Sequence, residues 1–385
     1  MVTTFKQNKF YEIRPAKDIS KIIQVGWGAD SMGDTFEVAA QNNLGNWSKF
    51  LLIPLDNNYY AIVCKNSGLV MKVSRADNSN GRWIEQWEWL DEEWEQGRES
   101  IFFEPVGNDT YAFQYKETGK YMTLSGRRTD VGTVCEQWEW ENGDWQHWKI
   151  KELSESIVLP SVEISPPPVA PDYNPSGDIN QILPEKSPTV TVSTALLPFF
   201  MVDDPYYTDV LKKFQSNPYY LLVKKQYYEK IGYQILAPHE SYSYTETNGI
   251  IESQQQEMEH TLSMTIGIDF GLQFKKFSSS FKYEISNSIR TLISKSLQKS
   301  KETTATRTVK NPLQQPASWT QYQLVTEYQV LRANGSPLAS PWSVKQENHS
   351  VSRFYPSIQG LLESTIQREL LEVKNKKTNV SFDNQ

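Results

Sequence analysis

The sequence predicts an all-β protein in two parts, an N-terminal β-trefoil and a C-terminal domain of long antiparallel strands. Three features carry this prediction: a repeat within the first 150 residues, a proline-rich stretch after it, and long alternating polar and apolar runs beyond that stretch. The expected boundaries are residues 1–155 for the trefoil, 156–190 for a linker and 191–385 for the second domain with its tail.

The repeat has an offset of 51 residues that is held without a gap. The pentapeptide Glu85–Trp89 returns unchanged as Glu136–Trp140, and Gly81 returns as Gly132. A third, more diverged copy begins near Tyr11. Each copy contains short alternating runs bounded by Gly, Asn and Asp, which is typical of antiparallel strands. Three copies of about four strands each indicate a β-trefoil.

The composition changes after the repeat. Eight prolines fall between Val158 and Val190, which predicts an extended linker or a chain laid along a surface. Beyond it, runs such as 241–245 and 320–331 alternate and predict long antiparallel strands. Apolar residues from Ile358 to Val373 follow helical spacing, ahead of a polar tail.

The charge and hydropathy patterns exclude several classes of partner. A net charge of −7 and a pI near 5.4 argue against a nucleic-acid-binding protein, which normally has a basic face. The first 25 residues carry charged side chains throughout, so we expect no Sec-type signal peptide. The longest apolar stretch, near Ala195–Val202, is too short to cross a bilayer as a helix. We expect any membrane contact to involve β-structure or the protein surface.

The residue types that usually carry chemistry are scattered. The four histidines share no ligand spacing, and H-E-x-x-H, G-x-S-x-G and phosphate-loop motifs do not occur. Cys64 and Cys135 also lack metal spacing, and we expect small buried side chains, with a disulfide as the alternative. The sequence therefore predicts no enzyme activity, no metal and no other cofactor.

The third repeat ends in Gln146-His147-Trp148, and this Gln-x-Trp signature resembles the ricin-B-type trefoil lectins. In that family, each repeat can hold a shallow site where an aromatic ring stacks on a sugar and polar groups bind its hydroxyls. The resemblance implies two such sites here, formed by Trp87 with Glu85 and Asp91, and by Trp138 with Glu136 and Asn142.

This chain departs from the lectin pattern in two ways. The first repeat has Ala39 in place of the aromatic residue, so we expect no site there. The acidic residue that chelates the sugar in the family is replaced by Gln24, Lys72 and Thr123. The alternative is that the repeated tryptophans fill the trefoil core. Because alternate residues share a strand face, at least one Trp of each pentapeptide is then expected to be buried.

The sharpest pattern of the second part alternates strictly over 13 residues. Its apolar members are Leu262, Met264, Ile266, Ile268, Phe270, Leu272 and Phe274. A strand of this length extends about 40 Å, which suffices for the ~25 Å apolar band of a transmembrane barrel even when tilted. The polar face is uncharged except for Asp269, and a turn is then expected at Lys275–Ser280. The alternative is a half-buried strand of a soluble sheet.

Four short motifs follow the linker in order: Phe200–Pro205, Pro218–Leu222, Gln226–Tyr228 and Pro238–Glu240. Their order and spacing resemble the binary-toxin-like insecticidal crystal proteins, the toxin-10 family of spore-forming bacteria, which also carry a ricin-B-like trefoil in front. The resemblance covers nearly the whole chain and implies an aerolysin-type fold for residues 191–385.

The resemblance also implies a function, that of an insecticidal pore-forming toxin without enzyme activity. Such a toxin binds glycan receptors on insect gut epithelium, forms homo-oligomers and inserts β-hairpins into the target membrane, in some members with a second toxin component. It is made in spore-associated crystal inclusions and acts outside the producing cell. Proteolytic trimming is expected in the polar tail, at Lys374, Lys376 and Lys377. Two rivals stay open: a plain lectin or storage protein, and a glycan-active enzyme with an appended trefoil.

Overall fold

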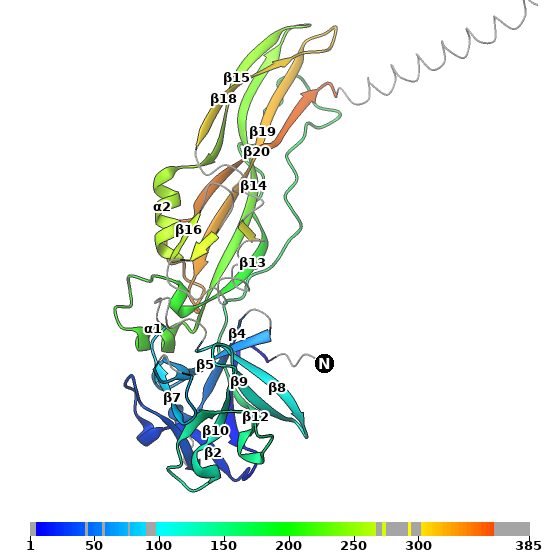
Figure 1. The fold of residues 1–385 in the computed structure, drawn as a ribbon. Helices are drawn as coiled ribbons and strands as arrows, with labels where there is room; N and C mark the ends of the chain where they lie inside the picture. Colours follow the sequence, from blue (N-terminus) through cyan, green and yellow to red (C-terminus); the bar gives the residue numbers. More distant parts are fainter. Residues whose placement is uncertain are drawn as a thin grey trace, which may run out of the picture.

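The computed structural model describes residues 5–42, 45–55, 58–75, 78–89, 98–266, 272–274, 292–293 and 302–357. The molecule is long, with a compact N-terminal part at one end and a narrow sheet extending away from it (Figure 1). The described strands all pair antiparallel, and the predicted all-β class is confirmed.

The N-terminal part is a β-trefoil. Among the described residues its strands are β1 (Lys9–Pro15), β2 (Lys21–Val25), β3 (Phe36–Ala40), β4 (Phe50–Pro54), β5 (Tyr59–Cys64), β6 (Val70–Val73), β7 (Arg82–Trp87), β8 (Ile101–Gly107), β9 (Thr110–Tyr115), β10 (Tyr121–Leu124), β11 (Cys135–Trp138) and β12 (His147–Ser156). Strands β1, β4, β5, β8, β9 and β12 pair in a closed ring, which forms a barrel. The other six pair as hairpins β2–β3, β6–β7 and β10–β11, which cap one end of the barrel.

Three glycines in the cap share one geometry. Gly33, Gly81 and Gly132 have φ angles of 88°, 81° and 88°, in the left-handed region that favours glycine. Each donates its amide to a carbonyl of a neighbouring hairpin at 2.9 Å, and the acceptors are, in order, Gln86, Gln137 and Val38. These equivalent hydrogen bonds show which residues of the three repeats correspond to one another, including those of the diverged first copy.

The barrel interior buries apolar side chains from all three repeats, and both cysteines lie among them. Cys64 and Cys135 are free thiols, as the first of the two expectations had it. Burial raises the pKa of Cys64 to about 11 and also raises the pKa of Cys135. Because the thiolate is the reactive form, these residues serve packing rather than chemistry.

The second part is a six-stranded antiparallel sheet in the order β13-β14-β19-β20-β15-β18. Its described elements are β13 (Val190–Pro198), α1 (Val210–Ser216), β14 (Tyr219–Leu236), β15 (Ser241–Ile250), α2 (Glu252–Thr261), β16 (Met264–Ile266), β17 (Leu272–Phe274), β18 (Thr303–Lys310), β19 (Ala317–Leu331) and β20 (Trp342–Tyr355). The alternating runs at 241–245 and 320–331 lie in β15 and β19, as predicted. In the described parts of the chain, no helix is long and apolar enough to cross a bilayer.

The proline-rich stretch lies along this sheet, and we call residues 165–187 the strap. Figure 1 shows it as the green coil that runs beside the long strands. The hydroxyl of Tyr173, which is buried, lies 2.6 Å from Oγ1 of Thr320 and 3.2 Å from Oγ of Ser318. The amide of Ser187 donates to the carbonyl of Tyr228 at 2.9 Å. Of the two expected structures, the chain laid along a surface is the one observed.

One apolar cluster joins the two parts of the molecule. It combines trefoil side chains such as Leu51 and Val63 with Leu197 and Phe214 of the second part. The approach is close, because a Cβ placed on Gly68 would lie 3.2 Å from the side chain of Phe214. The buried apolar contact packs the trefoil firmly against the base of the sheet.

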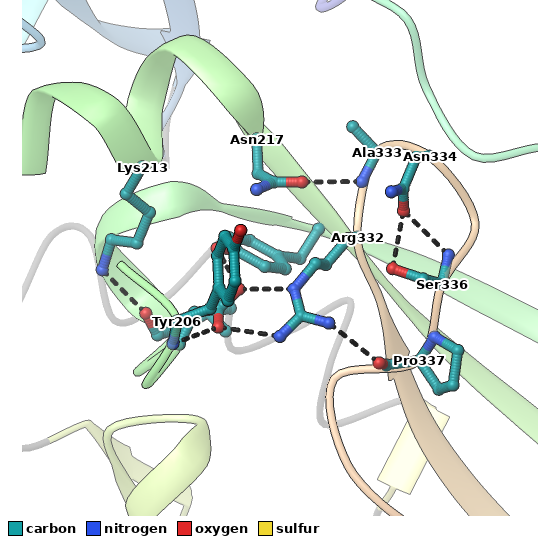
Figure 2. A network of polar contacts seen from close by, with 11 residues as sticks. Tyr206, Lys213, Asn217, Arg332, Ala333, Asn334, Ser336 and Pro337 are labelled. Carbon is teal, nitrogen blue, oxygen red and sulfur yellow. Dashed lines mark hydrogen bonds and ion pairs between the residues drawn. The ribbon is translucent and has the colours of Figure 1, made fainter. Parts of the chain in front are cut away.

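A buried ion pair holds the segment between β13 and β14 in place (Figure 2). The guanidinium of Arg332 makes two hydrogen bonds, of 2.8 and 2.9 Å, to the carboxylate of Asp204, which also accepts one from Tyr220. Burial raises the pKa of Asp204, but the hydrogen bonds from Arg332, the Tyr206 amide and Tyr220 outweigh it and lower the pKa. The carboxylate is therefore charged and paired, and the 199–217 segment is anchored to the β19–β20 turn.

Candidate functional site

Each cap hairpin carries a glutamate at the same place. Glu37, Glu85 and Glu136 lie directly opposite a residue of the paired strand, and those residues are, in order, Gln24, Lys72 and Thr123. All three opposite residues are buried. They occupy the positions where the lectin resemblance places the sugar-chelating acid, so in this chain the available carboxylate lies on the second strand of the hairpin instead.

In the third repeat, the structure brings Glu136 and Trp138 together. A Cβ placed on Gly81 would lie 3.7 Å from the Trp138 ring and 3.9 Å from Oε2 of Glu136, so both side chains border this glycine. Burial raises the pKa of Glu136, and a hydrogen bond from Ser125 opposes this shift. Asn142 occupies an exposed turn with φ 52°, and none of the described contacts links it to the other two.

In the second repeat, Glu85 and Trp87 are both half-buried on β7. The Trp87 ring covers Gly33, where an added Cβ would lie 3.5 Å away. Nζ of Lys72 lies 5.1 Å from the centre of the same ring, within the range of a cation–π contact. Asp91 lies outside the described residues.

In the first repeat, Ala39 is buried, and a Cβ placed on Gly132 would meet nothing within 4 Å. The glycine that a tryptophan covers in the other two repeats is therefore bare. This repeat has no aromatic ring at the position of Trp87 and Trp138; the exposed Trp27, whose amide lies 3.4 Å from Oε1 of Glu37, belongs to a neighbouring turn.

The expectation that one tryptophan of each pentapeptide fills the core is wrong. Trp87, Trp89 and Trp138 are half-buried, and Trp140 is 38% exposed. The buried position directly before the first tryptophan belongs to a glutamine in both copies, Gln86 and Gln137. For example, the Gln86 amide donates to the Ser31 carbonyl at 3.0 Å and accepts from the Ser67 hydroxyl at 2.7 Å. The strand faces its polar amide inward because that amide ties neighbouring loops together.

The Gln-x-Trp signature is structural in this chain. Gln146 is buried, and its side chain donates to the carbonyl of Glu139 and accepts from the amide of Glu141, both at 2.8 Å. Trp148 is buried in the barrel, and its indole donates to the Met122 carbonyl at 3.2 Å. The signature thus holds the loop that follows Trp138.

One aromatic residue of the site was missed in the sequence. Trp83 is 56% exposed on β7 and lies directly opposite Glu136 on β11. It has no counterpart in the repeat, so repetition does not reveal it. The alternation of β7 does place it on the face of Glu85 and Trp87, and that is the signal that was available.

The predicted membrane segment folds back on itself. Ile266 pairs with Leu272, and Met264 pairs with Phe274, so the chain reverses between β16 and β17. The expected turn at Lys275–Ser280 lies outside the described residues. A single straight strand would leave one apolar face uncovered in a monomer, whereas here Leu262 and Met264 are buried in the cluster that joins both parts.

The remaining residues predicted for insertion and trimming cannot be placed. Ile268 and Phe270 lie outside the described residues, as do Lys374, Lys376 and Lys377. Near the segment, Leu292 and Ile293 are buried in the same cluster, and their carbonyls lie 3.2 and 3.5 Å from the Tyr328 hydroxyl.

Both parts of the chain match known protein families. Residues 190–353 match the family described as Insecticidal Crystal Toxin, P42, and residues 91–163 match the Ricin-type beta-trefoil lectin domain-like family. The solved structure of Cry35Ab1 covers 96% of this chain and 97% of its own, with a TM-score of 0.68 and 20% identity. The fold is therefore that of a trefoil followed by an elongated antiparallel β-domain, as in Cry35Ab1.

Relatives of known sequence agree with this class. Binary larvicide subunit BinA of Lysinibacillus sphaericus is 28% identical over 179 residues, which is 46% of this chain and 48% of BinA. Subunit BinB of the same organism is 27% identical over 261 residues, covering 62% of this chain and 56% of BinB. The chain spans about half the length of these curated relatives. The resemblance seen in the sequence is confirmed: the chain is similar to binary-toxin-like crystal proteins, and its first part is similar to ricin-type trefoils.

Proposed function

We propose that the protein is an insecticidal pore-forming toxin. Its trefoil binds a glycan receptor on gut epithelium, and its second domain oligomerises and inserts β-hairpins to form a transmembrane β-barrel. The observation that carries this proposal is the match of the long sheet to a family described as an insecticidal crystal toxin. The relatives are named as larvicide subunits, which supports action on insects and a second toxin component as partner.

The trefoil supports the binding step. Glu136 and Trp138 stand together at the cap, and a half-buried indole beside a carboxylate offers a stacking face and hydrogen-bond acceptors for a sugar. Glu85 and Trp87 form the second such pair, and Asp91 and Asn142 are the polar groups we assign to the rims of the two sites.

The segment from Leu262 to Phe274 supports the insertion step. In the monomer its first apolar residues are packed in the cluster at the base of the sheet, so insertion requires them to leave that cluster. Only a closed ring satisfies every backbone group in lipid, so several subunits must each contribute a hairpin. In the barrel, Ile266, Ile268, Phe270 and the other apolar members of the alternation face lipid.

Single-channel recording in planar bilayers tests this step. Ile268→Lys places a charge on the lipid face near mid-bilayer, at a cost of about 2–4 kcal/mol per subunit, and should abolish conductance. The matched variant Asp269→Lys faces water, so it should keep conducting while its selectivity shifts from cations toward anions. Each variant is first shown to fold and to bind its receptor as the unmodified protein does.

A cysteine scan of 262–274 with a water-soluble thiol reagent reads the alternation directly. Block at odd positions alone fits a lumen-facing strand. A flat pattern, or one repeating every three to four residues, rejects the β-barrel assignment for this segment.

The rivals are separated by simple assays. A plain lectin or storage protein releases no dye from liposomes that carry receptor glycans, whereas the proposed toxin does. A glycan-active enzyme would cleave labelled glycans, and we expect no cleavage, because we propose a toxin that needs neither enzyme activity nor a cofactor.

Processing and origin complete the proposal. We assign trimming to Lys374, Lys376 and Lys377, and production to spore-associated crystal inclusions, with action outside the producing cell. Limited trypsin digestion followed by mass measurement should show loss of the tail first. A tail that stays intact after other sites are cut contradicts the trimming assignment.

A further inference from the structure

We propose that the third repeat holds the principal carbohydrate site, that Trp83 of the second repeat forms its second aromatic wall, and that its ligand is a neutral pyranose of a glycan. This inference rests on the proposed function of the trefoil as the receptor-binding part. It adds a residue that determines specificity and a class of sugar.

The strand register places both indoles next to one carboxylate. Trp83 lies directly opposite Glu136, so their side chains share a face of the sheet. The Trp138 ring lies over Gly81, which precedes Trp83 by two residues on the same side of the chain. Residues two apart along an extended strand are separated by about 7 Å.

That spacing fits a sugar ring. A ring in contact with an indole lies about 3.5–4 Å from it, so a pyranose held between two indoles needs about 7–8 Å. Trp83 is 56% exposed and Trp138 is half-buried, so a ligand can reach both. Glu136 lies opposite Trp83 and borders the same glycine as Trp138, so its carboxylate oxygens can accept hydrogen bonds from the hydroxyls of such a sugar.

The equivalent places in the other two repeats lack this pair of indoles, so we expect the third repeat to bind the sugar most tightly. The residue opposite Glu85 is Thr35, and the residue opposite Glu37 is Val134. The residue across from Glu85 is therefore not aromatic, and Nζ of Lys72 lies over the ring of Trp87. In the first repeat, Ala39 replaces the tryptophan that covers the glycine in the other two repeats. A two-walled site occurs in the third repeat alone, among the three places that the cap symmetry relates.

Charge at the third site selects a neutral ligand. Glu136 lies at its base, and Glu139 follows Trp138 directly. The nearby cation, Lys120, is paired with Glu139 at 3.3 Å and donates to Oδ1 of Asn80 at 2.7 Å. The carboxylate of a sialic acid would meet this negative charge in a partly buried place, where repulsion is little screened.

A glycan array tests the inference with the full-length protein. The array presents oligosaccharides in pairs, one neutral and one with a terminal sialic acid on the same core. Binding should favour the neutral member of each pair. Trp83→Ala and Trp138→Ala should each weaken binding about tenfold, which corresponds to about 1.4 kcal/mol. Trp87→Ala, which alters the second site, should weaken binding less than Trp83→Ala does, and Trp140→Ala serves as the matched control for losing a surface indole.

A gain-of-function variant guards against loss through misfolding. Thr35→Trp places a second indole opposite Glu85 and should raise binding in a Trp138→Ala background. If Trp83→Ala binds glycans as well as the wild type does, Trp83 is not a second wall of the site. If only Trp87→Ala loses binding, the principal site lies in the second repeat. Preference for the sialylated members overturns the neutral ligand. If the unmodified protein binds no glycan at all, the proposed function of the trefoil fails as well, so the two failures are distinct.

Discussion

The pentapeptide Glu-Gln-Trp-Glu-Trp occurs twice in the trefoil, and its two copies meet different surroundings. In the first copy, Trp89 stacks on Phe200 of the second part, with ring centres 4.1 Å apart. In the second copy, Trp140 lies at the surface beside Tyr121 and His147. Identical residues on symmetry-related strands therefore serve a joint between domains in one place and an outer face in the other. The repeated sequence gives both tryptophans the same local structure, and the residues that surround each one determine what it contacts.

The largest effect should follow from removing the support of the first copy. Phe200 belongs to the segment that the Asp204–Arg332 pair anchors. Arg332→Met leaves Asp204, which is 1% exposed, without its cation, and should lower the free energy of unfolding by about 3–5 kcal/mol. Urea titration measures this. A loss below 1 kcal/mol would show that the pair does not anchor the segment.

The pH dependence of the same pair has a definite sign. The pKa of Asp204 is lowered in the folded protein, so its contribution to stability is present above the ordinary aspartate pKa and is lost as the pH falls through the folded value. Unfolding free energies of Arg332→Met and the unmodified protein should therefore converge in acid. A difference that stays constant down to pH 3 contradicts this account.

A smaller effect should separate the two tryptophans themselves. Trp89→Ala removes a stacked contact in the apolar joint and should cost about 2 kcal/mol, while Trp140→Ala should cost less than about 1 kcal/mol. Thermal melting of both variants, with domain separation followed by limited proteolysis, measures the contrast. Equal losses would mean that both copies are structural in the same way.

The smallest effect concerns the glutamate of the second copy. Since burial raises the pKa of Glu136, its neutral form is favoured in the folded state, and that contribution is lost as the pH rises through the folded value. Glu136→Gln should then raise the melting temperature by about 1–2 °C at pH 7 and by nothing near pH 4. The same variant should weaken glycan binding, so stability and binding move in opposite directions. A fall in both would point to lost packing instead.

The repeat in the sequence was sufficient to predict the trefoil fold, because a constant offset means that each strand and turn of one repeat recurs in the next. It also predicted the bare position at Ala39. The repeat could not predict contacts between residues far apart in the sequence. The contact of Trp89 with Phe200 joins residues more than 100 positions apart, and Trp83 meets Glu136 through a register between repeats that no periodicity encodes.

The second domain shows the same limit. Alternation located β15 and β19, since exposed and buried faces follow every second residue. It did not reveal that the chain between Met264 and Phe274 reverses, because a hairpin and a straight strand alternate alike. The prolines indicated the extended strap. Its position on the sheet, however, depends on single contacts such as that of Tyr173 with Thr320, which the sequence does not show.

The closed ring of the trefoil has a consequence for how such proteins diversify. Strands β1 and β12 pair with each other, with Lys9 opposite Ser156, so the chain enters and leaves the trefoil at the same seam. A trefoil whose ends adjoin can be exchanged as a unit without changing the path of the chain through the long sheet. The replacement must keep the apolar patch of Leu51 and Val63 at the joint, while the cap with its tryptophans is free to change. The trefoil can therefore change by replacement while the long sheet is retained.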